Sequence, residues 1–342
     1  MQESLEDIAQ ALVAGGKGIL AADESNATIK KRFDTLGIVC TEDSRRAYRE
    51  MLFTSSDAMK RYISGVILYD ETLRQKANDG RSMSEVIGSF GAYAGIKVDR
   101  GLSPLAGFAG EMITEGLDGL RARLQEYYQL GARFAKWRAA LAIDAYYLPS
   151  RCAVEQNAYA LARYAALCQE VGLVPIVEPE ILMDGTPGDH SIDRCYEVSE
   201  AVLRTTFAAL FTARVKLEAM ILKPNMVIDG KKKRQASARE VAEKTAHVLK
   251  RTVPAAVAGV AFLSGGQDDV EATEHLALMQ EMGPFPWPLT FSYGRALQAA
   301  ALKIWAGEDM NMDAAQQAFC QRARMNALAA SGQWTPAAEQ ED

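Results

Sequence analysis

The chain has 342 residues, of which 49% are hydrophobic and 24% are charged. This composition is typical of a globular protein and excludes an intrinsically disordered chain. The formal net charge of -6 lacks the basic excess of a general nucleic-acid binder, so no nucleic-acid partner is expected. An anionic substrate would need a local basic pocket.

The cysteines and histidines limit the chemistry further. Five cysteines are widely spaced without a Cys-x-x-Cys pair, which fits a reducing compartment better than a disulfide framework. His190, His247 and His275 lie too far apart for a helical ligand pair, so neither a metal site nor a cofactor is expected. The first residues do not resemble a signal peptide, and no run reaches about 20 apolar residues. The sequence therefore predicts a cytoplasmic protein with no membrane partner.

Short apolar runs alternate with longer amphipathic stretches along the chain. After a leading helix at 4–14, we expect strands at 18–23, 63–70, 94–99, 134–141, 174–180, 219–224, 259–264 and 288–294. We expect helices at 44–55, 117–131, 155–172, 196–215 and 238–253, and a trailing helix at 313–330. Apolar runs without strict alternation are typical of parallel strands that are buried on both faces.

Eight strand–helix repeats without a linker-like stretch predict an α/β protein with one (β/α)8 TIM barrel over residues 1–342. Additional helices are expected at the N- and C-terminal ends of this single domain. An open, doubly wound sheet is the alternative. Residues 335–342 have the composition of a flexible tail, and the basic run 231–234 that of a solvated loop.

Charged residues gather where the predicted strands end, which is where TIM barrels place their active sites. They are Asp23, Lys97, Lys136, Arg138, Glu178, Glu180, Lys223 and Arg295. Any one of them could belong to a structural ion pair, but eight at one end of a barrel indicate a functional site. Five cations against three acids leave an excess of two positive charges, which suits a phosphorylated ligand.

Several lysines in one dry cavity also indicate amine chemistry. Lysine is nucleophilic only when neutral, and a neighbouring cation or loss of water makes that form accessible. At an effective dielectric of about 20, a like charge about 5 Å away is worth about two pKa units. Glu178 and Glu180, two apart on one strand, share a face and can supply the acid that expels water from a carbinolamine. These features favour a metal-free Schiff base with a carbonyl substrate.

Two glycine-containing turns, at 262–267 and 292–295, follow the last two predicted strands, where this fold often binds phosphate. They offer backbone amides, a hydroxyl and a guanidinium from Ser264, Gly265, Gly294 and Arg295. A further polar cluster, at 23–32, contains Ser25, Thr28, Lys31 and Arg32. This cluster is either a second phosphate-binding site or an ordinary helix N-cap with a charged first turn.

The motifs GKGILAADES, GIKVD, FAKWR, VPIVEPEIL, LKPNM, FLSGGQ and FSYGRALQ occur in this order along almost the whole chain. As a set they resemble class I fructose-1,6-bisphosphate aldolase. The resemblance implies that Lys223 forms the Schiff base, that Glu178 is the acid/base, and that Asp23 assists cleavage. Lys136 and Arg138 match the family's active-site cations.

The resemblance also assigns the two phosphates. Ser264, Gly265, Gly294 and Arg295 correspond to the C1-phosphate site of the hexose. Lys97 and Ser25 fall at the C6-phosphate site, and Thr28 stands where the family often has a second serine. The implied reaction is the reversible cleavage of fructose 1,6-bisphosphate to two triose phosphates, in glycolysis and gluconeogenesis, by a homotetramer.

One departure from the family concerns the proton donor. Eukaryotic members carry a C-terminal tyrosine that helps to protonate the enamine, whereas no tyrosine follows Tyr293 here. We expect Glu178, or a water that it holds, to take this role.

The alternatives from sequence are a metal-dependent aldolase or sugar-phosphate isomerase on the same barrel, and a catalytically silent sugar-phosphate-binding protein. Tagatose and sedoheptulose bisphosphates are not excluded as substrates.

Overall fold

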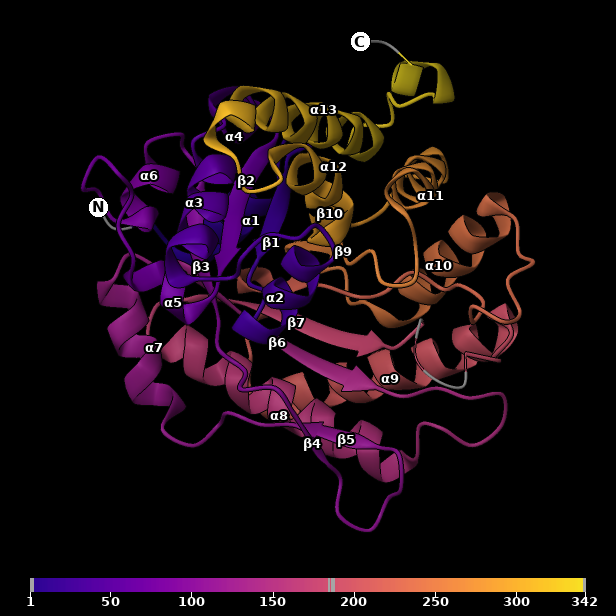
Figure 1. Ribbon diagram of the computed structural model, residues 1–342. Helices are drawn as coiled ribbons and strands as arrows, with labels where there is room; N and C mark the ends of the chain where they lie inside the picture. Colours follow the sequence, from indigo (N-terminus) through magenta and orange to yellow (C-terminus); the bar gives the residue numbers. More distant parts are fainter. Residues whose placement is uncertain (1–2, 184, 186–187, 341–342) are drawn as a thin grey trace.

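The computed structural model describes residues 3–183, 185 and 188–340, and within them eight parallel strands close into a barrel (Figure 1). The order around the barrel is β1-β10-β9-β8-β7-β6-β3-β2. The bounds are β1 Gly18–Ala22, β2 Ile63–Leu68, β3 Tyr93–Lys97, β6 Phe134–Leu141, β7 Val174–Ile181, β8 Ile221–Leu222, β9 Gly259–Phe262 and β10 Leu289–Tyr293. The predicted TIM barrel is confirmed, and each predicted strand is found.

Helices surround this barrel. They are α1 Leu5–Val13, α2 Asn26–Asp34, α3 Glu42–Phe53, α4 Ser56–Arg61, α5 Asp70–Arg74, α6 Met83–Gly88, α7 Leu120–Gln129, α8 Arg151–Glu170, α9 Ile192–Thr212, α10 Ala238–Thr252, α11 Asp269–Glu281, α12 Arg295–Trp305 and α13 Met312–Ala330. None of the helices in the described part of the chain has the length and apolarity that crossing a membrane requires.

The predicted helices are present, but the sequence reading missed several others. Helices α4, α5 and α6 have six residues or fewer, so their periodicity is too short to recognise. Helix α11 packs against α10 and α13, so it has no single apolar stripe. The reading also missed the antiparallel hairpin of β4 Leu102–Pro104 and β5 Met112–Thr114, which lies at the lower edge of Figure 1.

Helix α1 closes the N-terminal end of the barrel. Its apolar residues Ile8, Ala9, Leu12 and Val13 join a buried cluster with inward-facing strand residues such as Phe134. Small residues on the strands make room for these side chains. A Cβ on Gly65 would lie 2.6 Å from Leu12, and one on Gly95 would lie 2.2 Å from the Phe134 ring. The lower half of the barrel is therefore filled with apolar side chains, which leaves the other end for the site.

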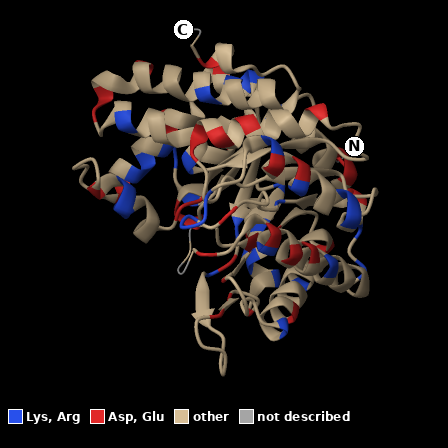
Figure 2. Ribbon diagram, turned by 90° about the vertical axis from the view of Figure 1, so that its right-hand side faces the viewer, with Lys and Arg blue, Asp and Glu red and all other residues tan. Residues whose placement is uncertain are grey.

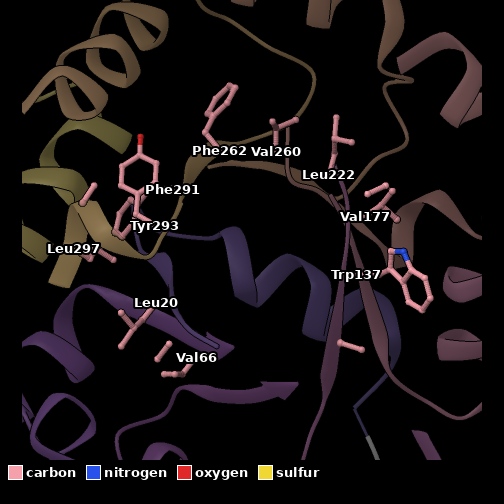
Figure 3. Close-up of a cluster of buried hydrophobic side chains, with 14 of the residues drawn as sticks. Leu20, Val66, Trp137, Val177, Leu222, Val260, Phe262, Phe291, Tyr293 and Leu297 are labelled. Carbon is pink, nitrogen blue, oxygen red and sulfur yellow. The ribbon is translucent and has the colours of Figure 1, made fainter. Parts of the chain in front are cut away.

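The opposite faces of the strands build the outer core. Leu20, Val66, Trp137, Val177 and Leu222 point away from the barrel axis toward the helices (Figure 3). Trp137 packs against Tyr164 of α8, with ring centroids 5.6 Å apart. Alternation along each strand thus separates an apolar outer layer from the residues inside the barrel.

The segment after α13 differs from the flexible tail that the sequence predicts for 335–342. Residues Pro336–Gln340 form a short 3-10 helix, η3. Glu339 accepts hydrogen bonds at 2.7 and 2.8 Å from the Arg322 guanidinium of α13, and another at 2.9 Å from the Trp334 indole. A bidentate ion pair of a largely buried arginine therefore attaches this segment to α13. Residues 341–342 lie outside the described residues.

Gly95→Ala is expected to lower the free energy of unfolding by about 1–3 kcal/mol, because the added methyl group overlaps the Phe134 ring. Urea denaturation followed by circular dichroism measures the change. Gly88→Ala is the control, since its Cβ meets no atom within 4 Å, and alanine favours the α6 helix. Equal denaturation midpoints for Gly95→Ala and the wild type would contradict this account of barrel packing.

Candidate active site

A cavity of about 1110 Å³ opens at the C-terminal ends of the strands. All thirteen site residues that the sequence predicts line it: Asp23, Ser25, Thr28, Lys97, Lys136, Arg138, Glu178, Glu180, Lys223, Ser264, Gly265, Gly294 and Arg295. Residues that are up to 272 positions apart in sequence thus meet in one place. The closure of the barrel brings them together.

Strand periodicity directs the charged side chains inward. On β6, Phe134 belongs to the apolar cluster at the N-terminal end, and Lys136 and Arg138, two and four residues later, line the cavity. On β7, Ile176 lies in the same apolar cluster, and Glu178 and Glu180 follow it into the cavity. On both strands, the residues that face into the barrel therefore change from apolar to charged toward the C-terminal end, where the site lies.

Lys136 connects two carboxylates from different strands. Its ammonium lies 2.7 Å from Asp23 Oδ2 and 3.1 Å from Glu178 Oε2. Only 5% of the Lys136 side chain is exposed, and the Glu178 side chain is equally buried. Charges so far from water are stable only when they are paired, so these three residues form one electrostatic unit.

Lys223 belongs to the same unit. It follows the short strand β8, and its Nζ lies 3.2 Å from Glu178 Oε1. One carboxylate therefore contacts two lysines, one through each oxygen. The Lys223 side chain is 4% exposed and lines the cavity, so a substrate that enters the cavity can reach its amine.

The lysines determine how the two carboxylates titrate. Burial alone would raise the pKa of Asp23, but Lys136 and Lys223 outweigh it and lower this pKa to about 2. Glu178 behaves in the same way, because the attraction of the two lysines exceeds the effect of burial and lowers its pKa. Burial opposes the charged form of Lys136, yet Asp23 and Glu178 raise its pKa above the ordinary lysine value. All three groups are therefore ionised at neutral pH.

Two further ion pairs flank this unit. The Arg138 guanidinium pairs with Glu180, and Lys97 Nζ lies 2.6 Å from Asp99 Oδ1. The sequence reading did not include Asp99, although it lies two residues after Lys97 and lines the same cavity. The spacing of two residues was the signal that could have found it.

The predicted phosphate-binding turns are adjacent to these pairs. Gly294 is the N-cap of α12 and Arg295 its first residue, so the positive end of this helix lies at the cavity. A Cβ on Gly265 would lie 3.3 Å from Glu180 Oε1, so the turn after β9 packs closely against the glutamate. Arg234 supports the same turn by donating a hydrogen bond of 2.8 Å to the Gly266 carbonyl. In the basic run 231–234, the three lysines are exposed as predicted, whereas Arg234 is half-buried against this turn.

Ser25 and Thr28 fit both interpretations of their cluster. Ser25 is the N-cap of α2 and accepts a hydrogen bond of 3.3 Å from the Thr28 amide, as a structural cap does. Their hydroxyl oxygens are 3.1 Å apart, and both residues line the cavity. The cap holds the two hydroxyls together at the mouth of the site.

Other lining residues were outside the sequence prediction, including Glu24, Arg100 and Arg123. In total, nine lysines and arginines and seven aspartates and glutamates line the cavity, an excess of two positive charges. On the surface helices the two signs are interspersed (Figure 2). A chain of net charge -6 thus contains a basic site. Within the described residues, no group of three His, Cys, Asp or Glu side chains is arranged to hold a metal ion.

Lys136→Met is expected to lower the free energy of unfolding at pH 7 by about 3–5 kcal/mol, because two buried carboxylates lose their shared cation. In the wild type, Asp23 has a pKa below its unfolded value of 3.8, so its stabilisation is complete above that value and is lost as the pH falls toward 2. In the variant, Asp23 loses its nearest cation and the hydrogen bond from it, so we expect burial to raise the pKa of Asp23. The variant should therefore gain stability as the pH falls from 8 to 5.

Urea denaturation at pH 5, 7 and 8 measures both effects. Lys30→Met is the matched control, because Lys30 pairs with Asp34 on the exposed surface of α2 and its loss should not move the midpoint. A Lys136→Met protein with wild-type stability and wild-type pH dependence would refute the buried ionic unit.

Comparison with known proteins agrees with this geometry. The family model described as fructose-bisphosphate aldolase class-I matches residues 4–342. The chain is 58% identical over 335 residues to a probable fructose-bisphosphate aldolase class 1 of Xanthomonas campestris pv. campestris, covering 97% of this chain and 98% of the relative. It is 50% identical to fructose-bisphosphate aldolase B of Gallus gallus, with 97% and 91% covered.

A solved structure of fructose-bisphosphate aldolase from Plasmodium falciparum, in complex with TRAP and a small-molecule inhibitor, superposes with a TM-score of 0.94 at 47% identity. This alignment covers 97% of the present chain and 95% of that structure. The match of sequence and fold extends over nearly the full length. The chain therefore belongs to the class I fructose-bisphosphate aldolase family.

Proposed function

We propose that the chain catalyses the reversible cleavage of fructose 1,6-bisphosphate to dihydroxyacetone phosphate and glyceraldehyde 3-phosphate, through a Schiff base on Lys223. The observation that carries the proposal is the pair of Lys223 and Glu178, 3.2 Å apart and almost fully buried in a basic cavity. Membership of the aldolase family supports the same reaction. It is a carbon–carbon lyase reaction of glycolysis and gluconeogenesis that needs no cofactor.

The contacts of the three cavity lysines favour Lys223 as the nucleophile. Lys136 is held between two carboxylates that raise its pKa, so it stays protonated and does not attack a carbonyl. Lys97 gives two hydrogen bonds to Asp99, one to its carboxylate and one to its backbone carbonyl. Among the residues that the structure describes, the Lys223 ammonium forms an ion pair with Glu178 alone, and that carboxylate can accept its proton.

Carbinolamine formation and dehydration follow from this arrangement. Neutral Lys223 attacks C2 of the open-chain ketose, and one proton of the attacking nitrogen passes to the carbonyl oxygen, which becomes the carbinolamine hydroxyl. Glu178, which has received a proton from Lys223, returns one to this hydroxyl, which leaves as water. The nitrogen lone pair then forms the C=N bond of a protonated imine. Lys136, 3.1 Å from Glu178, stabilises the carboxylate that results.

The protonated imine accepts the electron pair when the C3–C4 bond breaks. Glu178 or Asp23 removes the proton of the C4 hydroxyl, and C4 becomes the aldehyde carbon of glyceraldehyde 3-phosphate. The electrons of the C3–C4 bond pass to the iminium and give an enamine of dihydroxyacetone phosphate on Lys223. Protonation at C3 and hydrolysis then release the second triose phosphate and restore the amine.

The two phosphates would lie at opposite ends of the cavity. We assign the C1 phosphate to Ser264, Gly265, Gly294 and Arg295, where a guanidinium and a helix N-terminus come together. We assign the C6 phosphate to Lys97 with the hydroxyls of Ser25 and Thr28. Arg138, paired with Glu180, lies on β6 next to this substrate path.

We also propose that the protein is a cytoplasmic homotetramer, as the sequence resemblance implies. Large apolar side chains that a subunit interface could cover are exposed at Tyr146, Tyr147 and Phe211, the last of which is 84% exposed. Light scattering should give a mass of four chains of 37.3 kDa each, and a monomer mass would contradict the tetramer.

Borohydride reduction in the presence of dihydroxyacetone phosphate should fix a triose-phosphate adduct on Lys223, because borohydride reduces an imine to a stable amine. Peptide mass mapping locates the adduct. Lys223→Met, a matched variant without the amine, should give none. An adduct on Lys136 or Lys97, or no adduct in the wild type, would overturn the proposed mechanism.

Glu178→Gln should slow exchange of the C3 proton of dihydroxyacetone phosphate by about 100-fold or more, because we propose that Glu178, or a water it holds, protonates the enamine. Proton NMR in deuterated water measures this rate. Glu180→Gln serves as the comparison, since its carboxylate pairs with Arg138 instead of Lys223. Unimpaired exchange in Glu178→Gln would assign the step to another group.

A further inference from the structure

Asp99 occupies a buried position between two strands that carry site residues. It follows β3, only 8% of the residue is exposed, and it lines the cavity. Its Oδ2 accepts a hydrogen bond of 3.3 Å from the Arg138 amide on β6. Its Oδ1 accepts one of 3.2 Å from the Gly101 amide. Both oxygens are therefore fixed by backbone donors, and the carboxylate has a defined orientation.

The same carboxylate orients Lys97. The Lys97 ammonium donates hydrogen bonds of 2.6 Å to Asp99 Oδ1 and 2.8 Å to the Asp99 backbone carbonyl. An ammonium has three N–H donors, so one remains available. The Lys97 side chain is 17% exposed, against 4% for that of Asp99. The cation thus reaches the cavity while the acid stays behind it.

We propose that Asp99 is a positioning residue that directs Lys97 toward the distal phosphate and lowers the affinity of that site. The inference rests on the proposed function, in which Lys97 binds the C6 phosphate. Asp99 keeps two ammonium protons, so a phosphate receives the third. Its negative charge also repels the phosphate across Lys97, which lets the phosphorylated aldehyde product leave.

This role follows from the charge on Asp99 and does not require it to touch the substrate. The Arg138 ion pair already has its own acid, Glu180, so Asp99 is not needed to neutralise it. Asparagine at position 99 keeps one oxygen, which can still accept from the Gly101 amide and from Lys97. It removes the charge, and its NH2 group replaces the oxygen that accepts from the Arg138 amide, so that one backbone hydrogen bond is lost as well. The distal phosphate should then bind more tightly, while the C1 end of the substrate is unaffected.

The experiment compares fructose 1,6-bisphosphate with fructose 1-phosphate, which has no distal phosphate. In Asp99→Asn, the ratio of kcat/KM for the bisphosphate to kcat/KM for the monophosphate should rise about three- to tenfold. A loss of packing or stability would affect both substrates equally and leave the ratio unchanged. An unchanged or lower ratio overturns the proposal.

Two further variants show whether the effect acts through Lys97. Glu126→Gln removes another acid from the cavity wall, one that pairs with Arg74 at 2.6 Å, and should change the ratio less than twofold. In a Lys97→Ala background, Asp99→Asn should no longer raise the ratio. A rise that persists without Lys97, or that Glu126→Gln reproduces, would assign the effect to the general field of the cavity and overturn the proposal.

A binding measurement separates this inference from the proposed function. Glucitol 1,6-bisphosphate has no carbonyl group and cannot be cleaved, so calorimetry gives its Kd without turnover. Asp99→Asn should lower that Kd about three- to tenfold, and an unchanged or higher Kd overturns the inference. Failure of the wild type to cleave fructose 1,6-bisphosphate would contradict the proposed function and leave this binding result interpretable.

Discussion

The site depends on the ion pairs of Lys136 inside the barrel. Its ammonium lies within 3.1 Å of both Asp23 and Glu178, and Glu178 in turn contacts Lys223 at 3.2 Å. A buried charge without a partner would be strongly unfavourable, so each of these groups requires the others. The same contacts set their protonation states, with the pKa of Lys136 raised and the pKa of both acids lowered. The same contacts therefore stabilise the folded protein and set the protonation states on which the reactivity of the site depends.

One end of the barrel is apolar and the other is charged, and single strands contribute residues to both ends. Phe134 on β6 packs in the apolar cluster that α1 covers, and Lys136 follows it into the polar cavity. The tightly packed apolar cluster holds the strands in register. The charged side chains that follow on the same strands are therefore held in fixed positions. A packing defect at Gly95 or Gly65 would therefore reach the site through the strands, without any contact with a substrate.

Much of the site could be predicted because its residues lie on strands. A charge inside a short apolar run, such as Lys223 after Ile221 and Leu222, contradicts the burial that the run implies, and this conflict indicates function. Asp99 is the last residue of the predicted strand 94–99, and it was missed because Lys97 was taken as the charged residue of that strand and its ion-pair partner cannot be identified without the structure. The β4–β5 hairpin was missed because strands of three residues have no recognisable alternation. This hairpin contacts the site strand β6, since the Thr114 hydroxyl donates a hydrogen bond to the Arg138 carbonyl.

By itself the sequence determined the barrel, the end of the barrel that carries the site, and the residue types that meet there, because strand period and chain order are local properties. Only the tertiary structure decided the partners. It paired Lys136 with Asp23 and Glu178, and Lys97 with Asp99, and it attached the segment at 336–340 to Arg322. Ion-pair partners depend on distances across the closed barrel, and no pattern along the chain encodes those distances.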